Sequence, residues 1–434
     1  MKNTPAMADY ELRHIEALRK NLAGCTVLLK KDGSFPLEKP CTLAAYGSGV
    51  RRTIRGGTGS GEVNSRYSVT IEEGLQQAGF TLTGMEWHTG YEQARKKAHK
   101  AFLKQLKKDA KAVKQNFILY GMGKAMPEPE YNLPLNAEGD AAIYVVSRIS
   151  GEGNDRTPLK GDIRLTDSEV RDILALDKKF TRFMLVLNVG GVVDLSPVMD
   201  VRNILLLSQL GVETGGALAD ILLGKANPSG KLTTTWAAFE EYPEMPDFED
   251  MNETRYREGI YVGYRYFDTF RKPALFPFGH GLSYTEFRLG AVAVEANGAQ
   301  ITVRTFVENI GALAGRQVVQ VYLSKPSGKF DAPWQELCAF AKTHELAPGE
   351  TESVTCSFTL PEMAAYDTET ASYILEAGDY LVRVGVSSVE TAPAAVLHLD
   401  KTVTTLQANN VLGSTDFTDL TAPAATMERP AGVP

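Results

Sequence analysis

Short apolar runs alternate with amphipathic segments over the first 290 residues of the chain. The runs are apolar on both faces and rich in β-branched and aromatic residues, as is typical of strands buried in a parallel sheet. They occupy residues 42–47, 117–121, 141–147, 183–190 and 203–208. Apolar residues at helical spacing lie between them, in segments 12–22, 70–78, 167–180 and 213–224. This alternation predicts an α/β layer fold with a mostly parallel sheet.

Two of the predicted helices have a feature besides apolar spacing: one begins with a capping pattern, and the other is rich in basic residues. Thr166 is followed three positions later by Glu169, which is the pattern of a capping box and predicts a helix start. A helix over residues 92–115 would hold nine Lys and Arg residues, which leaves open a face that binds phosphate or nucleic acid. We favour a solvated helix with an apolar side that packs inward. That side consists of Ala94, Ala98, Phe102, Leu106 and Val113.

From about residue 290 the pattern changes to apolar–polar alternation in short segments. It recurs at 301–309, 316–324, 350–360 and 373–388, with turns that contain Gly or Pro between them. This spacing predicts an antiparallel β-sandwich of roughly 100 residues, similar in size to an immunoglobulin-like module. After about residue 405 the chain is rich in Ala, Thr and Pro without periodicity, which indicates a linker and suggests a neighbouring domain.

Composition and charge narrow the class of protein. A chain of 434 residues is expected to form two or three compact units, and 43% hydrophobic and 23% charged residues are typical of globular proteins. The net charge of -7 gives nucleic-acid binding no overall electrostatic support. No apolar run reaches the roughly 18 residues of a membrane span. The charged N-terminus lacks the apolar core of a secretion signal.

The spacing of the cysteines and histidines indicates whether disulfides or a structural metal site are expected. Cys25, Cys41, Cys338 and Cys356 are far apart in sequence, and the six histidines never pair at i,i+4. A disulfide scaffold or a structural zinc site is therefore not expected. We predict free thiols and a cytoplasmic protein.

A glycine-rich loop, RGGTGSGEV (55–63), follows the first predicted parallel strand by several residues. It is not a phosphate-binding loop, because Glu62 stands where the Lys of a P-loop would be, and it lacks GxGxxG spacing. Ser60 does not lie in GxSxG either, so a nucleophile elbow is excluded. Such a loop lets backbone approach a neighbour closely, with Ser60 and Glu62 as polar contacts.

A second candidate, SGEGNDRTPLKGD (150–162), directly follows the run at 141–147. A carboxylate on a glycine-flanked loop at the carboxyl end of a strand is placed where α/β folds bind ligands. Glu152 would serve as a general acid, a role that requires a raised pKa, while Asp155 and Arg156 could pair and fix the loop. Glu128 and Glu130 are competing carboxylates on the preceding segment.

The third block, residues 256–287, combines aromatic side chains with charged ones. These charged or titratable residues are Arg257, Glu258, Arg265, Asp268 and His280. The block could line a sugar subsite, although a structural wrap of hydrogen-bonded aromatic residues is the interpretation we favour. We expect His280, between two glycines, to be a structural imidazole.

Taken together, these segments strongly resemble glycoside hydrolase family 3, the β-glucosidase family. The matching motifs, in family order, are TVLLKKDGSFPL (26–37), GGTGSG (56–61), SGEGNDR (150–156), NVGGVVDLS (188–196), GVETGGALADILLGKANPSGKLTTTW (211–236), YREGIYVGYRYFD (256–268) and FPFGHGLSYTEF (276–287). PWQELCAFAK (333–342) and LAPGE (346–350) resemble the fibronectin type III-like domain that accompanies these enzymes. The resemblance implies an α/β/α sandwich domain over 1–289, a fibronectin type III-like β-sandwich over 290–403 and a tail over 404–434.

The resemblance also implies a missing part. Members of the family carry a (β/α)8 barrel whose Ser-Asp-Trp motif supplies the nucleophile and whose Lys-His pair grips the sugar, and neither motif occurs in this sequence. Some members are permuted, with the sandwich first and the barrel last. The chain begins with the sandwich and ends in a predicted linker, so it looks like the front part of such an enzyme. The barrel would then belong to the full-length protein or act in trans.

Residue roles carry over only where the motifs match. Glu152 takes the family position of the acid/base carboxylate. Ser60 takes that of a loop residue that approaches the sugar, with Gly59 and Glu62 beside it. Asp155 and Arg156 would shape the loop, and no nucleophile is assigned in this chain.

The resemblance implies a retaining, exo-acting hydrolase that removes terminal non-reducing β-D-glycosyl residues from a β-linked glucoside or oligosaccharide. No metal or organic cofactor is implied, and no nucleic-acid or membrane partner; a homo-oligomer is compatible with this function. The alternative is a non-catalytic carbohydrate-binding or accessory protein that lacks the barrel nucleophile.

Overall fold

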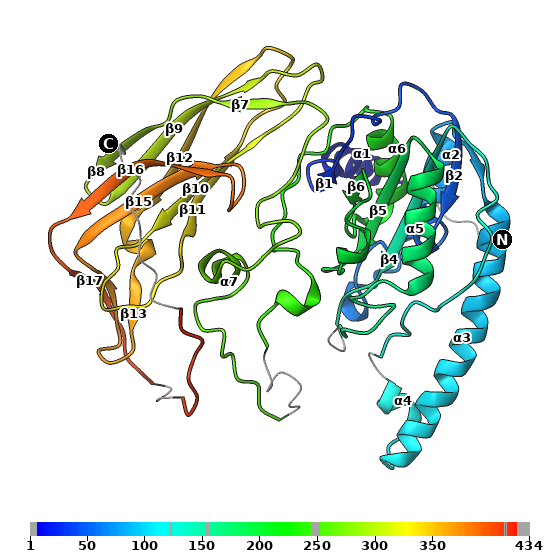
Figure 1. The fold of residues 1–434 in the computed structure, drawn as a ribbon, viewed down its shortest axis with the longest axis horizontal. Coiled ribbons are helices and arrows are strands. Elements are labelled where there is room, and N and C mark those ends of the chain that lie inside the picture. The colour runs from blue at the N-terminus through cyan, green and yellow to red at the C-terminus, as the bar shows by residue number, and fades with distance from the viewer. Residues whose placement is uncertain are drawn as a thin grey trace. The chain divides into compact units, whose positions relative to one another are not determined.

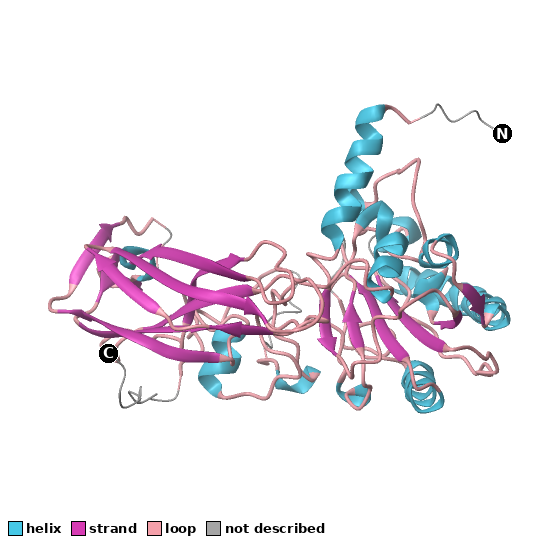
Figure 2. Ribbon diagram, turned by 90° about the horizontal axis from the view of Figure 1, so that it is seen from above, coloured by secondary structure: helices cyan, strands magenta, loops and turns pink. Residues whose placement is uncertain are grey.

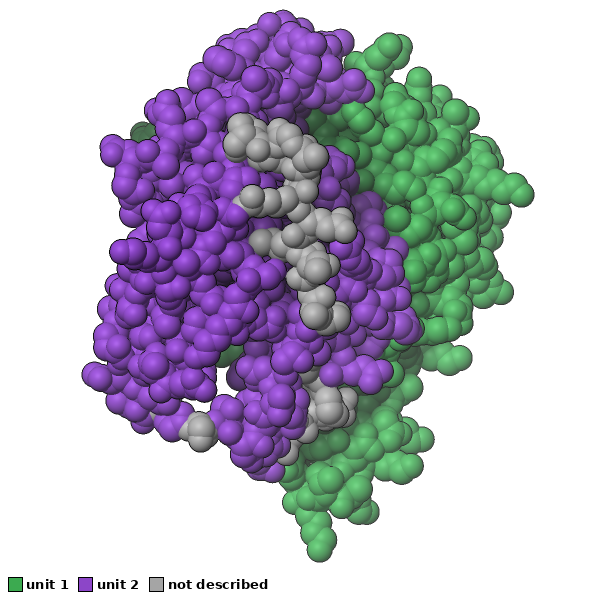
Figure 3. All heavy atoms as spheres, turned by 60° about the vertical axis from the view of Figure 1, so that its left-hand side comes forward, with its two compact units in different colours: residues 1–230, 281–284 green, residues 231–280, 285–434 purple. Residues whose placement is uncertain are grey.

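The computed structural model describes residues 7–121, 124–152, 156–244, 252–411, 413 and 415–422. The chain forms two compact units: residues 1–230 with 281–284, and residues 231–280 with 285–434 (Figure 3). The predicted domain limit at 289 does not coincide with this division, because residues 231–280 group by their contacts with the second unit.

A six-stranded sheet forms the centre of the first unit, in the order β1-β6-β5-β4-β2-β3 (Figure 1). Five of these strands are parallel, and β1 pairs with β6 in the antiparallel direction. The mostly parallel α/β sheet is therefore confirmed. The strands are β1 (Val27–Lys30), β2 (Thr42–Tyr46), β3 (Thr81–Thr83), β4 (Ala141–Arg148), β5 (Phe183–Val189) and β6 (Ile204–Leu206).

Helices cover both faces of this sheet (Figure 2). They are α1 (Asp9–Leu22), α2 (Ile71–Gln77), α3 (Met85–Ala112), α4 (Phe117–Gly121), α5 (Asp167–Lys179) and α6 (Thr214–Leu222). Every residue of β4 and β5 is buried, as predicted for strands with helices on both sides. The capping box at the start of α5 is also confirmed: the Thr166 hydroxyl accepts from the Glu169 amide at 3.1 Å, and the Glu169 carboxylate accepts from the Thr166 amide at 2.8 Å.

The prediction of a strand at 117–121 was wrong, because these residues form the helix α4. The Asn116 carboxamide accepts from the Ile118 amide at 2.8 Å, as a helix N-cap does. Ile118 and Leu119 are 71% and 67% exposed, so this apolar run does not enter the sheet core. A short apolar run does not by itself distinguish helix from strand.

The Lys-rich segment is the long helix α3. Leu106 is buried as predicted, whereas Val113, just beyond the last helical residue, is 54% exposed and does not pack inward. The helix buries an aromatic end instead, where Trp87 and Tyr91 stack with ring centroids 5.3 Å apart. The lysines of α3 are exposed to solvent.

The second unit contains the predicted antiparallel β-sandwich. Its sheets have the orders β11-β10-β15-β16, β12-β9-β7 (with β8 paired to β9) and β13-β14-β17. The strands are β7 (Phe287–Leu289), β8 (Ala293–Asn297), β9 (Gln300–Asn309), β10 (Val318–Ser324), β11 (Glu336–Lys342), β12 (Thr351–Thr359), β13 (Ala365–Asp367), β14 (Ser372–Leu375), β15 (Gly378–Gly385), β16 (Thr391–Leu399) and β17 (Val403–Gln407). The same unit holds helix α7 (Tyr264–Phe270).

The strand β17 crosses the predicted start of the tail at 404, because it pairs with β14. Further along, the Leu420 amide donates to the Arg257 carbonyl at 2.6 Å, so described residues beyond 407 also contact the second unit. Single-turn 3-10 helices complete the structure at Ser48–Val50, Gly59–Gly61, Ser196–Val198, Gly211–Glu213, Phe239–Glu241 and Leu360–Met363. None of the helices in the described part of the chain is long and apolar enough to cross a membrane.

Candidate functional site

The order of the parallel strands creates a switch point between β2 and β4. From β2 the chain passes to β3 on one side, and the later strands β4, β5 and β6 add on the other side. In open α/β sheets, ligands bind beyond the carboxyl ends of the strands at such a point. The glycine-rich loop follows β2 there, and the loop with Glu152 follows β4.

The two loops meet through backbone contacts. The Ser60 amide donates to the Glu152 carboxylate at 2.8 Å, and the Thr58 hydroxyl donates to the Glu152 carbonyl at 2.9 Å. Gly59 has a φ of +67°, and a Cβ there would lie 2.5 Å from the Glu152 carboxylate oxygen. A Cβ on Gly151 would lie 2.2 Å from the Thr58 amide nitrogen. Glycine is therefore required on both sides of the contact.

Asn188, at the end of β5, fixes the start of the glycine-rich loop. Its side-chain oxygen accepts from the Ile54 amide at 2.6 Å, and its nitrogen donates to the Ile54 and Ser208 carbonyls at 2.9 and 2.6 Å. The residue is fully buried. No role was assigned to Asn188 from sequence, although an Asn at the end of an all-apolar strand was the available signal.

Arg156 anchors the far side of the Glu152 loop. Its guanidinium donates to the Asp162 carboxylate at 2.8 Å and to the Val192 carbonyl at 2.7 Å. Asp155, the predicted partner of Arg156, lies outside the described residues, so this pairing stays a prediction. The observed ion pair with Asp162 ties the loop back to its own continuation.

The Glu152 side chain is exposed in this chain, and its electrostatics differ from those expected of a general acid. The hydrogen bond from the Ser60 amide lowers the pKa of Glu152 below its ordinary value. A general acid requires a raised pKa, so the expected raised value is not found here. The cause is that a hydrogen bond to the carboxylate stabilises its charged form while little burial opposes ionisation.

The competing carboxylates have other surroundings. Burial, and then the neighbouring Glu169, raise the pKa of Glu128 to about 7, and the Tyr91 hydroxyl donates to its carboxylate. Glu130 caps helix α5: it accepts from the Asp167 and Ser168 amides, each at 2.9 Å. Burial opposes ionisation of Glu130, but the hydrogen bond from the Ser168 hydroxyl, together with those from the two amides, lowers its pKa overall. In the described part of the chain, neither carboxylate forms a hydrogen bond or ion pair with the Ser60 loop.

The remaining predicted residues lie in two places. Glu62 is exposed at the end of the turn Gly59–Gly61, next to Ser60. In the aromatic block, burial raises the pKa of Asp268 to about 6, and its carboxylate accepts from Gln335 at 3.0 Å. Tyr264 stacks on Phe278 at 4.5 Å. These contacts fit the structural interpretation of the block.

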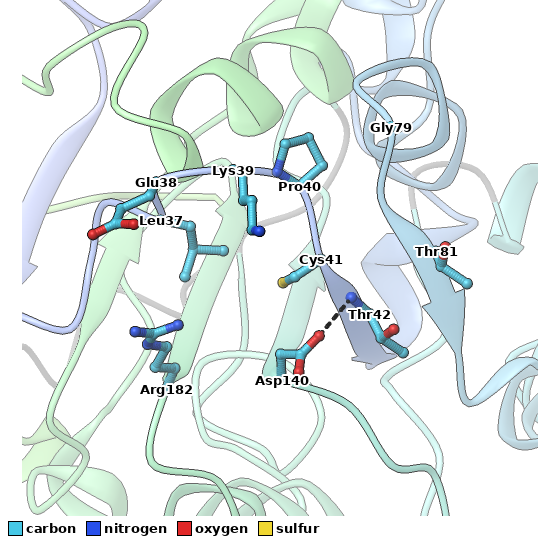
Figure 4. Close-up of a pocket in the computed structure, with 10 residues that line it drawn as sticks. All are labelled: Leu37, Glu38, Lys39, Pro40, Cys41, Thr42, Gly79, Thr81, Asp140 and Arg182. Atoms are coloured by element: carbon cyan, nitrogen blue, oxygen red, sulfur yellow. Dashed lines mark hydrogen bonds between the residues drawn. The ribbon is translucent and has the colours of Figure 1, made fainter.

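A separate cavity of about 500 Å³ lies at the opposite edge of the first sheet (Figure 4). Thr42 and Thr81 line it at the amino ends of β2 and β3, and the Thr42 amide donates to Asp140 at 3.0 Å. Burial raises the pKa of the Cys41 thiol in its wall. The cavity therefore lies away from the carboxyl ends that carry Glu152. The described residues contain no cluster of three or more His, Cys, Asp or Glu side chains suited to a metal ion.

Comparison with known proteins identifies the family of the chain. The sequence model of the glycosyl hydrolase family 3 C-terminal domain matches residues 26–284, and that of the fibronectin type III-like domain matches residues 317–388. Beta-glucosidase A of Butyrivibrio fibrisolvens is 34% identical over 87% of this chain and 50% of its own length. A beta-glucosidase of Ruminococcus albus is 33% identical over 84% of this chain and 38% of its own length.

Solved structures give the same result. Beta-glucosidase 3B from Thermotoga neapolitana, in complex with alpha-D-glucose, has a TM-score of 0.77 and 34% identity, covering 92% of this chain and 55% of that one. This chain thus spans about half the length of these relatives, or less. Because the family's C-terminal domain matches more than half of the sequence, the chain belongs to glycoside hydrolase family 3 and carries the family's C-terminal and fibronectin type III-like domains.

Proposed function

We propose that this chain supplies the acid/base half of a retaining β-glycosidase site, with Glu152 as the acid/base. The full site would remove terminal non-reducing β-D-glycosyl residues, as in a β-glucosidase. Its nucleophile would come from a (β/α)8 barrel domain in the full-length protein or in trans. We propose a cytoplasmic location, since all four cysteines are free thiols.

The observation that carries this proposal is the contact between Ser60 and Glu152 at the switch point of the sheet. Glycine-rich backbone on both sides leaves no side chain between the two loops, and the carboxylate is exposed. An exposed carboxylate held by one backbone amide can receive a substrate from the solvent side. Ser60, Gly59 and Glu62 would then lie beside the sugar.

In the proposed reaction, a barrel carboxylate attacks the anomeric carbon while Glu152 protonates the departing glycosidic oxygen. Glu152 then removes a proton from the water that releases the glycosyl-enzyme. Retention requires the two carboxyl groups to lie about 5–5.5 Å apart. A second carboxylate at that distance, together with burial by the barrel, would raise the pKa of Glu152. Its low pKa in this chain is consistent with half a site.

The test is the Glu152→Ala variant of the full-length enzyme, assayed on β-glucosides with leaving groups of different acidity. We expect turnover to fall most for poor leaving groups, because these depend on protonation. Azide should restore turnover and give a β-glycosyl azide, since azide needs no general base to attack the glycosyl-enzyme. Equal loss for all leaving groups, without azide rescue, would contradict the acid/base role.

The chain by itself provides the matched comparison. Nitrophenyl β-glucoside, β-xyloside and β-galactoside are each mixed with the folded 434-residue chain, with and without an added family 3 barrel. We expect turnover only when the barrel is present. Turnover by the chain alone would show that a nucleophile lies within it. Sugar binding without turnover, even with the natural full-length protein, would favour a non-catalytic accessory role.

A further inference from the structure

The three-stranded sheet β13-β14-β17 of the second unit has an exposed aromatic face. Tyr366 on β13 is the direct cross-strand partner of Tyr373 on β14, which is the direct partner of Leu406 on β17. Directly paired residues point to the same side of a sheet. The three side chains are 42%, 40% and 58% exposed. They therefore form a continuous row across the sheet, at roughly 4.8 Å per strand.

The opposite side of this sheet faces the interior. Ala365 and Ile374, the next pair along β13 and β14, line a small hollow with Met363 and Tyr380, which are both buried. The neighbouring Asp367 is buried and accepts from the Glu369 amide at 3.0 Å. Contacts on the opposite side of the sheet thus hold the strands in place. The row Tyr366–Tyr373–Leu406 is not needed to fill the core on that side.

The two tyrosines form a pair rather than isolated surface residues. Their ring centroids lie 5.1 Å apart, at an interplanar angle of 56°. Each ring offers an apolar face and a hydroxyl that can donate and accept. Solvent-exposed aromatic groups gathered in this way on a monomer are characteristic of binding surfaces.

The small number of charged residues on the three strands restricts the chemical class of ligand that this face can bind. Asp367, which is buried, is the only charged residue within the three strands. On β17, Thr404 and Gln407 pair with Ile374 and Ser372 and therefore point to the other side of the sheet, so the polar groups of the row itself are the two tyrosine hydroxyls. A nucleic acid or an acidic protein surface would find no cation on these strands, whereas a neutral ligand with apolar faces and many hydroxyls fits them.

We propose that Tyr366, Tyr373 and Leu406 form a binding platform for a neutral β-linked glucan. The aliphatic C–H faces of successive pyranose rings would lie over the tyrosine rings, and hydroxyls of the sugar would bond to the tyrosine hydroxyls. The choice of a glucan among neutral ligands rests on the proposed function. The platform belongs to the second unit and Glu152 to the first, and the platform would hold a polymer rather than cleave it.

The experiment measures retention of the protein on microcrystalline cellulose and its mobility in gels that contain soluble barley β-glucan. We expect the Tyr366→Ala/Tyr373→Ala variant to bind at least about tenfold more weakly, the scale of losing two aromatic contacts. Tyr373→Phe should keep most of the binding because it keeps the ring. The matched control is Phe340→Ala, which removes a 68% exposed aromatic side chain from β11 and should bind as the wild type does.

Three outcomes would overturn the platform. They are no binding by the wild type, equal binding by the double variant, and loss of binding in Phe340→Ala alone. A double variant that changes the oligomeric state and not glucan binding would assign this face to a protein interface. Unchanged turnover of nitrophenyl β-glucoside in the full-length double variant separates the platform from the catalytic proposal. Conversely, glucan binding that persists in Glu152→Ala shows that the platform does not depend on the proposed acid/base residue.

Discussion

The amide of Ser60 donates a 2.8 Å hydrogen bond to the carboxylate of Glu152, although 92 residues separate them in the sequence. The bond joins the loops that follow β2 and β4, at the switch point of the first sheet. Sheet topology thus determines which two loops meet. The glycines of the first loop determine how closely they approach.

Gly59→Ala should break this contact. A Cβ at residue 59 would lie 2.5 Å from a Glu152 oxygen, and φ = +67° is strained for any residue with a Cβ, by roughly 1–2 kcal/mol. We expect the pKa of Glu152 to rise toward its ordinary value, because the Ser60 amide is the main cause of its depression. Carboxyl-carbon NMR titration, with the Glu152 signal assigned from Glu152→Gln, measures this shift.

The matched control is Gly61→Ala, in the same turn. A Cβ there meets nothing within 4 Å. We expect an unchanged Glu152 titration in this variant. If both variants leave the titration unchanged, the close approach of the two loops does not control the charge of Glu152.

Asn188→Ala should destabilise the first unit. The side chain makes three hydrogen bonds, to both backbone groups of Ile54 and to the Ser208 carbonyl, and it is fully buried. Its removal leaves buried backbone groups without partners, which we expect to cost about 2–4 kcal/mol. Urea denaturation followed by circular dichroism measures the loss. Asn132→Ala, at an exposed position, should change the free energy of unfolding by no more than about 0.5 kcal/mol.

The central architecture could be predicted from the sequence because its signals are local. Strands such as β4 and β5 are apolar along most of their length, and the Thr166–Glu169 capping box spans one turn of chain. The loops at 55–63 and 150–162 could be recognised from their glycines and their position after strands. Their meeting could be expected only through the family resemblance.

What the sequence did not reveal depends on tertiary context. The run at 117–121 has the composition of a strand, but Asn116 caps it as a helix with two large apolar side chains exposed. The direction of the Glu152 pKa depends on one amide from a distant loop. Asn188 looked like the end of a strand and proved to hold three backbone groups. Contacts of this kind join residues far apart in the chain, and they cannot be predicted from the periodicity of the sequence.

The buried ion pair between Arg148 and Glu169 gives a further prediction. Their side chains are 5% and 1% exposed, and the closest atoms lie 2.6 Å apart. Arg148→Met should lower the free energy of unfolding by about 3–5 kcal/mol, because it leaves the Glu169 charge buried without its partner. Adding Glu169→Gln should recover part of this loss, since it removes the charge and can keep the cap on Thr166. Guanidinium denaturation of the wild type and both variants tests whether the free energy of unfolding falls in the order wild type, double variant, Arg148→Met. A double variant less stable than Arg148→Met would contradict it.

The buried His88 predicts how stability depends on pH. Burial lowers its pKa from 6.5 to about 4, while its ring nitrogen lies 3.0 Å from the Ala45 carbonyl oxygen. The unfolded chain therefore takes up a proton before the folded chain does. Stability from this residue is complete above pH 6.5 and is lost as the pH falls toward 4, by roughly 3 kcal/mol in total.

The test compares the wild type with His88→Gln, which can still donate to Ala45 but does not titrate in this range. Free energies of unfolding are measured at intervals from pH 7.5 to pH 4. Carboxylates contribute equally to both proteins, so the difference between the two curves isolates His88. We expect the variant's curve to be flatter by about 3 kcal/mol below pH 6.5, even if lost packing against Trp87 lowers its stability at every pH. Parallel curves would mean that His88 can be protonated inside the folded protein, and hence that α3 opens to water in this range.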